Sequence, residues 1–205
     1  MERRRAVHEI TKMLVVLTVI SVVSGSSLAF LEHVTREPIK YQKLKYVKGP
    51  AVEAVLKGSE NDPIKDHKEE ILFQEDGGEE IRKTVFPATK DGKLFALAFE
   101  VRGKGYHGPI DIMMGINVVT GKLTGIRIMS HSETPGLGAR TAEPEFYEQF
   151  SGLDMAQTAL SDKGGDINAV TGATITSTGV SEAVRKGMEL FENSKENILE
   201  EIKSE

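Results

Sequence analysis

The chain has 205 residues, a net charge of −5, a pI near 5.7 and no cysteine. Its acidic balance, without a basic stripe interleaved with aromatic residues, argues against nucleic-acid binding. The absence of cysteine excludes disulfides, thiolate zinc sites and cysteine-ligated iron–sulfur clusters. Any redox chemistry therefore requires an organic cofactor or a haem.

The N-terminal region contains an apolar stretch over residues 10–31 that follows three consecutive arginines, residues 3–5. No charged residue lies between Lys12 and Glu32. At about 1.5 Å per residue this stretch is long enough to cross a hydrocarbon core of about 30 Å. We therefore predict a single transmembrane helix. The preceding arginines predict that residues 1–9 are cytoplasmic and that the rest of the chain is extracytoplasmic.

A cleaved signal peptide is the alternative interpretation of this N-terminal region. Its apolar core would extend from Met13 to Val23, and Ser27-Leu28-Ala29 has the pattern of a cleavage site. Both interpretations place the remainder of the chain outside the cytoplasm.

Residues 32–80 are charged and only intermittently apolar, which predicts a membrane-proximal linker with a packed helix or two. Residues 51–56 have the pattern of a short helix that ends at Gly58. Turn signals follow at Asn61-Asp62-Pro63 and at Asp76-Gly77-Gly78. No catalytic constellation stands out in this region.

The apolar pattern changes to that of strands after Glu80. Residues 81–86 and 94–101 flank an Asp-Gly turn, and residues 110–119 and 123–129 flank a short glycine-containing loop. Strands in succession followed by helices predict an α+β domain over residues 81–193, with an antiparallel sheet covered on one side by packed helices.

Two glycine-containing segments border these strands. Residues 103–109 precede a strand instead of opening a helix, so they are not a dinucleotide-binding motif and are equally consistent with a bulge or tight turn. Residues 131–138 contain a Pro-Gly pair, which predicts an irregular loop. Taken alone, that loop is an ordinary connector.

Residues 141–150 and 194–205 are predicted to be structural, and no metal site is predicted. Residues 141–150 have an acidic first turn with an early proline, which predicts a helix whose aromatic residues belong to the core. The five histidines lack metal-ligand spacing, so we expect no metal site. Residues 194–205 are predicted to form an exposed charged tail.

The segment Thr171 to Ser177 is small, hydroxyl-rich and uncharged, and apolar residues at helical spacing follow it. The unpaired N–H groups at a helix N-terminus suit a phosphate, and a glycine allows the backbone to approach a ligand closely. Composition alone favours simple helix capping.

Residues 171–174 resemble the S/T-G-A-T flavinylation motif of the FMN-binding domain shared by the G subunit of Rnf-type and the C subunit of Nqr-type electron transport complexes. Residues 133–138 are similar to the E-T-P-G-L-G signature of the same family, and residues 103–106 to its G-x-G-Y segment. Two such motifs in the right order make coincidence improbable. The resemblance implies a flavin site formed by the residues Tyr106, Glu133, Thr134, Pro135, Gly136, Leu137, Gly138, Thr171, Gly172, Ala173, Thr174 and Thr176.

The resemblance also implies how the cofactor is held. FMN would be joined covalently to Thr174 by a phosphoester, which a separate flavin transferase installs from FAD. An unactivated hydroxyl is a poor nucleophile, which is consistent with the need for an external enzyme. The family commonly has an acidic residue three positions before the tetrad, where this chain has Asn168, and Asp166 could take its place after a small loop shift.

The resemblance implies a membrane-anchored electron carrier within an Rnf-type ferredoxin:NAD oxidoreductase complex that couples electron transfer to Na⁺ or H⁺ translocation. Its partners would be the other membrane and peripheral subunits. The C subunit of an Nqr-type Na⁺-translocating NADH:quinone reductase is the near alternative. An exported binding or assembly module without functional flavin, and an extracytoplasmic flavin reductase acting alone, are alternatives from other classes, although no nicotinamide-binding motif is present.

Overall fold

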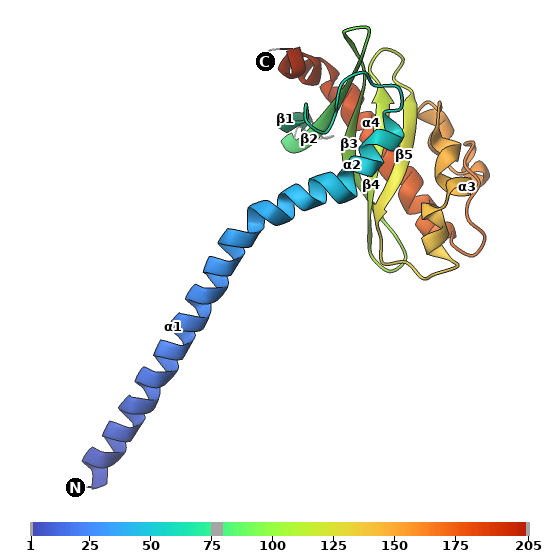
Figure 1. Cartoon of the computed structure of the whole chain (residues 1–205). Helices are drawn as coiled ribbons and strands as arrows, with labels where there is room; N and C mark the ends of the chain where they lie inside the picture. Colours follow the sequence, from blue (N-terminus) through green and yellow to red (C-terminus); the bar gives the residue numbers. More distant parts are fainter. Residues whose placement is uncertain (1, 75–79, 204–205) are drawn as a thin grey trace. The chain divides into compact units, whose positions relative to one another are not determined.

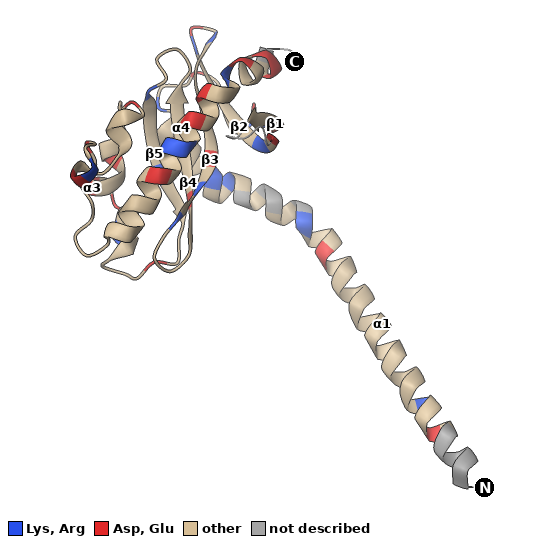
Figure 2. Cartoon of the chain, turned by 180° about the vertical axis from the view of Figure 1, so that it is seen from behind, with Lys and Arg blue, Asp and Glu red and all other residues tan. Residues whose placement is uncertain are grey.

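The computed structural model describes residues 2–74 and 80–203, and the chain separates into two compact units, Met1–Leu44 and Lys45–Glu205. The first unit consists almost entirely of helix α1 (Glu2–Lys43) (Figure 1). Within it, the most apolar 18-residue window of His8–Arg36 has a mean hydropathy of 2.3, and no part of that window is buried. Figure 2 shows the uncharged middle of α1 between charged residues near its two ends. Among the described residues, α1 is the one helix long and apolar enough to cross a membrane, and its retention in the mature protein stays a prediction.

The second unit is built on a five-stranded antiparallel sheet whose spatial order, β1-β2-β3-β4-β5, follows the chain. Its strands are β1 (Lys68–Gln74), β2 (Glu80–Lys90), β3 (Lys93–Lys104), β4 (Pro109–Asn117) and β5 (Leu123–Ser130). Asp91 and Gly92 join β2 to β3 with positive φ angles of 52° and 69°, which is the conformation that a two-residue hairpin of matching twist needs. The predicted α+β class is confirmed.

Helices cover both faces of the sheet, so the prediction of a sheet covered on one side is wrong. Residues Leu44–Lys48 (η1) lead into α2 (Gly49–Val55), and α4 (Thr174–Lys203) lies across the other face (Figure 1). A Cβ atom added at Gly115 would meet Val55 of α2, whereas one added at Gly187 of α4 would meet Met114. Adjacent strand residues point to opposite faces, so these contacts place the two helices on opposite sides. The apolar face of α2 provides the second cover.

The core lies mainly between the sheet and α4. The two elements bury apolar side chains that recur every second residue on the strands and every third or fourth on the helix, which include Val85, Leu97, Phe99, Ile112, Met114, Val180, Val184, Met188 and Phe191. Burying a side chain of this size contributes about 1.5–3 kcal/mol. The sheet and α4 are thereby fixed as a scaffold for the loops at one end.

Strand β1 lies inside the segment predicted to be a linker. Its sequence carries charged residues around the short apolar run Ile71-Leu72-Phe73, which is typical of an edge strand that discourages further pairing. Strand β2 also continues beyond its predicted end, through Pro87. Its pairing with β1 stops at Val85, so no β1 residue pairs with Pro87, and the proline is tolerated at an edge position.

Helix α4 continues well past the predicted end of the domain. Ser194 and Ile198 are buried, and the Gln74 N–H donates a hydrogen bond of 2.7 Å to Ser194 Oγ. These positions continue the helix face that begins with Phe191, because the spacing of three and four residues keeps them on one side. The expectation of an exposed tail is therefore wrong for the part of α4 that packs against β1.

The helix predicted over residues 141–150 is divided into short turns. They are η2 (Gly138–Ala142), α3 (Pro144–Tyr147) and η3 (Glu148–Phe150), and two further turns, η4 (Ala156–Thr158) and η5 (Ser161–Lys163), precede α4. Pro144 has no N–H to continue the preceding turn and instead starts a new one. The predicted core role of the aromatic residues is confirmed for Phe146 and Phe150, which are buried with ring centroids 5.7 Å apart.

Strand β3 and helix α4 approach each other closely at two glycines. A Cβ atom at Gly103 would lie 2.6 Å from the Gly179 carbonyl oxygen, and one at Gly179 would overlap the Lys104 carbonyl group. Any side chain at either position would force the helix away from the sheet. Gly179 is therefore retained inside a helix despite the poor helix propensity of glycine.

We expect Gly179→Ala to destabilise the folded domain by about 1–3 kcal/mol, the usual cost of overpacking. Helix propensity alone predicts the opposite sign, a gain of about 1 kcal/mol. The measurement is urea unfolding of the detergent-solubilised chain. Gly108→Ala is the control because a Cβ there meets nothing within 4 Å; a Gly179→Ala variant as stable as this control would contradict the close contact.

Candidate functional site

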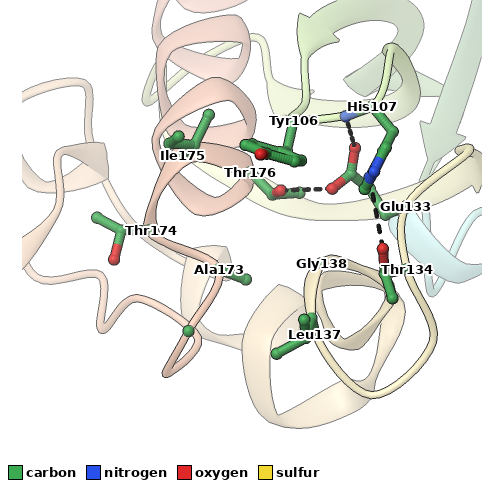
Figure 3. A pocket seen from close by; sticks show the side chains of 11 residues that line it. Tyr106, His107, Glu133, Thr134, Leu137, Gly138, Ala173, Thr174, Ile175 and Thr176 are labelled. Carbon is green, nitrogen blue, oxygen red and sulfur yellow. Dashed lines mark hydrogen bonds between the residues drawn. The ribbon is translucent and has the colours of Figure 1, made fainter.

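Three segments surround a cavity of about 460 Å³ at one end of the sheet. They are the turn between β3 and β4, the loop that follows β5, and the first turn of α4 (Figure 3). The lining residues are Tyr106, His107, Glu133, Thr134, Leu137, Gly138, Gly172, Ala173, Thr174, Ile175 and Thr176. The volume falls within the range of about 300–1,000 Å³ typical of small-molecule sites.

The start of α4 is fixed by a tight backbone turn. Gly172 adopts a φ of +80°, which glycine accepts without strain. The Ala173 N–H donates to the Val170 carbonyl oxygen at 2.9 Å, and the Val170 N–H donates to the buried Ser177 Oγ at 3.0 Å. These bonds tie the approach segment to the first helical turn. Ser177 thus anchors the segment that precedes the helix.

Thr174 is the first residue of α4, and its side chain is exposed. Its hydroxyl makes no hydrogen bond to any residue that the structure describes, and Figure 3 shows it directed away from Glu133. The first N–H groups of a helix have no intrahelical acceptor and carry partial positive charge. A free hydroxyl and unpaired backbone donors therefore occur together at the cavity wall.

Glu133 has a buried carboxylate, 7% exposed, at the inner end of the cavity. Its Oε2 accepts a hydrogen bond of 2.7 Å from Thr176 Oγ1, and its Oε1 accepts one of 2.9 Å from the His107 backbone N–H (Figure 3). Burial by itself would raise the pKa of Glu133, but the hydrogen bonds from Thr176 and His107, with the charges that His107 and His131 carry when protonated, lower it. The side chain is thus held as an anion.

Glycines leave the space that this carboxylate occupies. A Cβ atom at Gly105 would lie 2.5 Å from Glu133 Oε1, and a Cβ atom at Gly138 would overlap Glu133 Oε2. Both glycines belong to segments that line or border the cavity. The requirement for glycine at these positions is therefore close packing against Glu133, because neither residue has a positive φ angle.

The mouth of the cavity is apolar. Tyr106, Leu137 and Ile175 are exposed by 67%, 47% and 58%, and each comes from a different one of the three segments. The Tyr106 ring stands edge-on to the His107 ring, with centroids 4.8 Å apart. Exposed apolar side chains around a concave site are typical of ligand contact surfaces.

The structure brings most of the predicted site residues together around this cavity. Three of them, Thr171, Pro135 and Gly136, do not line it; Thr171 instead borders a shallower hollow beside Asn168. Sequence reasoning missed His107 and Ile175. Each is the immediate neighbour of a predicted residue, Tyr106 and Thr176 respectively, which was the available signal.

Asp166 and Asn168 have different hydrogen-bond partners, so the described hydrogen bonds do not place the carboxylate of Asp166 at the position of Asn168. The Asn168 backbone N–H and side-chain amide donate to Gln149 Oε1 at 2.8 and 3.3 Å. The carboxylate of Asp166 accepts a hydrogen bond of 2.8 Å from Gln157. Asp166 is thus bonded to a different glutamine from the one that binds Asn168.

Known proteins resemble this chain in the sequence around the cavity and in the fold. Residues 105–189, which include every residue lining the cavity, match the family model of the FMN-binding domain. The C subunit of the Na⁺-translocating NADH-quinone reductase from Parabacteroides distasonis has a similar fold, with a TM-score of 0.55 over 77% of this chain and 95% of that structure, at 19% identity. The fold and the cavity thus define an FMN-binding domain.

Two curated relatives identify the family. The chain is 31% identical to the G subunit of the ion-translocating oxidoreductase complex of Methanosarcina acetivorans, over 88% of this chain and 94% of the relative. It is also 31% identical to the G subunit of the proton-translocating ferredoxin:NAD(+) oxidoreductase complex of Clostridium ljungdahlii, over 84% and 86%. The chain belongs to the family of G subunits of ion-translocating oxidoreductase complexes.

We expect Glu133→Gln to lower the free energy of unfolding by about 1–3 kcal/mol at pH 7, because it weakens two buried hydrogen bonds to a charged group. A pKa lowered by folding stabilises the protein above the unfolded value of about 4.3, and this contribution is lost as the pH falls through the folded pKa. The stability difference between wild type and variant should therefore shrink below about pH 4.

The measurement is urea unfolding between pH 3 and pH 8, with Glu145→Gln as the control because Glu145 is exposed and does not line the cavity. A difference that stays constant across this range would contradict the proposed stabilisation of the anion.

Proposed function

We propose that this chain is the membrane-anchored electron carrier of an Rnf-type complex, which holds FMN covalently through a phosphoester to Thr174. The observation that carries the proposal is the free, exposed hydroxyl of Thr174 at the first position of α4, on the wall of the 460 Å³ cavity. The relatives from ion-translocating oxidoreductase complexes support the choice of complex.

The described residues fit FMN by their chemistry. The unpaired N–H groups at the start of α4 suit the phosphate, and Gly172 leaves room for a close approach. Leu137 and Tyr106 offer apolar surface to the flavin ring at the mouth of the cavity. When bound, FMN accepts and releases electrons, so the redox chemistry belongs to the cofactor and the protein supplies binding and orientation.

Attachment requires a second enzyme because no described group can activate Thr174. Glu133 is already bonded through both oxygens, and Figure 3 shows the Thr174 hydroxyl directed away from it. We infer that a flavin transferase catalyses attack of Thr174 Oγ1 on the FMN phosphorus of FAD. One P–O bond forms, the bond to AMP breaks, and the hydroxyl proton passes to a base of the transferase.

The complex that we propose transfers electrons between ferredoxin and NAD and couples this transfer to movement of Na⁺ or H⁺. The arginines at residues 3–5 support an orientation with the N-terminus inside and the FMN domain on the extracytoplasmic side of the cell membrane. The other membrane and peripheral subunits of the complex are the proposed partners.

We expect Thr174→Ala to abolish covalent flavin while the fold is retained, because an exposed side chain without hydrogen bonds is removed. The experiment is intact-mass spectrometry and peptide mapping of the chain co-expressed with an active flavin transferase. Thr178→Ala, one turn further along α4 and outside the cavity, is the matched control and should keep the FMN adduct. An unmodified wild-type chain, beside a control substrate that is modified, would favour a binding module without flavin.

We expect Leu137→Ala to leave attachment intact but to change the absorption spectrum of the bound flavin. Leu137 is half-exposed at the mouth, and its removal admits water next to the ring. The measurement is the visible spectrum of the flavinylated variant, compared with Val119→Ala, which removes an exposed apolar side chain far from the cavity lining. Identical spectra in all three proteins would count against contact between the ring and this loop.

A further inference from the structure

We propose that Glu133 is a positioning residue that fixes the three walls of the cavity and, through its negative charge, lowers the reduction potential of the flavin. This inference rests on the proposed function. The sequence motif implied that Glu133 belongs to the flavin site, and the geometry points to an action through charge and through other residues.

The carboxylate connects all three segments of the site. Glu133 itself belongs to the loop after β5, its Oε2 is bonded to Thr176 in α4, and its Oε1 is bonded to the His107 N–H in the turn before β4. The neighbours of these two partners, Ile175 and Tyr106, form part of the apolar mouth. One side chain therefore sets the relative positions of the residues that contact a ligand.

The negative charge of Glu133 is not neutralised by a lysine or arginine among the described residues. Among the residues that the structure describes, no lysine or arginine forms an ion pair with it, and the titratable groups that face it are His107 and His131. Where both histidines are neutral, the inner end of the cavity carries the net negative charge of the Glu133 carboxylate.

This charge is poorly screened. Glu133 is 7% exposed, and the backbones of Gly105 and Gly138 lie so close that even a methyl group would not fit beside its oxygens. Water and counter-ions screen buried charges much less than exposed ones. An anion in this position acts on the contents of the cavity more strongly than a surface carboxylate.

Reduction of a bound flavin is the equilibrium that this charge affects. Full reduction takes two electrons from an external donor and one or two protons from solvent; where one proton is taken up, the ring gains one negative charge. A fixed anion opposes that gain. At a distance of roughly 10 Å and an effective dielectric constant of about 20, one unit charge changes the equilibrium by about tenfold.

The test is an anaerobic dithionite titration of the full flavinylated chain in detergent at pH 8, with a reference redox dye. Glu133→Gln should favour the reduced flavin by about tenfold, a rise in midpoint potential of about 30 mV for a two-electron couple. Glu145→Gln removes an equal charge from the surface and should shift the equilibrium by less than about threefold, because exposed charges are screened. Thr174 is unchanged in both variants, and the titration is made on the flavinylated fraction of each, identified by intact mass.

A second variant separates charge from position. Glu133→Asp keeps the charge on a shorter side chain, so we expect its thermal stability to be lower. Its midpoint potential should differ from that of the wild type by less than the equivalent of about a threefold change in the reduction equilibrium. A midpoint potential in flavinylated Glu133→Gln equal to that of the wild type would overturn the inference. A rise in Glu133→Asp as large as the rise in Glu133→Gln would also overturn it. Where the Gln variant does not fold, a rise of about 30 mV or more in Glu133→Asp would by itself overturn the inference, because that variant retains the charge. Absence of flavin from the wild type would instead be a failure of the proposed function.

Discussion

The close backbone contact between β3 and α4 determines where the site is formed. At Gly103 and Gly179 the two elements approach more closely than any side chain allows. The chain leaves β3 after Lys104, the residue next to Gly103, to form one wall of the cavity, and the first turn of α4, just before Gly179, forms another. Both walls therefore start from one contact, and their separation is fixed by the rigid scaffold below them.

The third wall is positioned by polar bonds instead of apolar packing. The loop after β5 folds back on itself where the Leu137 and Ala139 N–H groups both donate to the Thr134 carbonyl oxygen at 3.2 Å. The carboxylate of Glu133 then joins this loop to the other two walls. Polar groups of this kind are costly to bury unless they are all bonded, so the geometry of the loop is specified by its hydrogen bonds.

The sequence predicted those parts of the fold in which local signals agree. Strands β2 to β5 have apolar runs bounded by clear turn residues, and α4 has a regular apolar face. Strand β1 was missed because the charges that protect a sheet edge remove the alternation by which a strand is recognised. The buried continuation of α4 at Ser194 was missed because its partner is that same strand.

The site was predicted largely through family resemblance, since small residues such as Gly172 and Ala173 carry little chemical signal of their own. His107 was missed because it contributes its backbone N–H to Glu133, and a backbone donor is available from almost every residue type. The network around Glu133 also could not be predicted, because it joins residues 26 and 43 positions apart in the chain. Only the three-dimensional arrangement brings these groups together.

The exposure of Thr174 has a consequence for the order of events during biogenesis. Because Thr174 is exposed and its hydroxyl makes no bond to any described residue, the proposed attachment of FMN does not need to precede folding of the domain. The buried neighbours Thr176 and Ser177 are sealed within the structure by the same folding event. Folding thus buries two hydroxyls of the cluster and leaves those of Thr171 and Thr174 exposed, so the attachment that we propose is compatible with a finished domain.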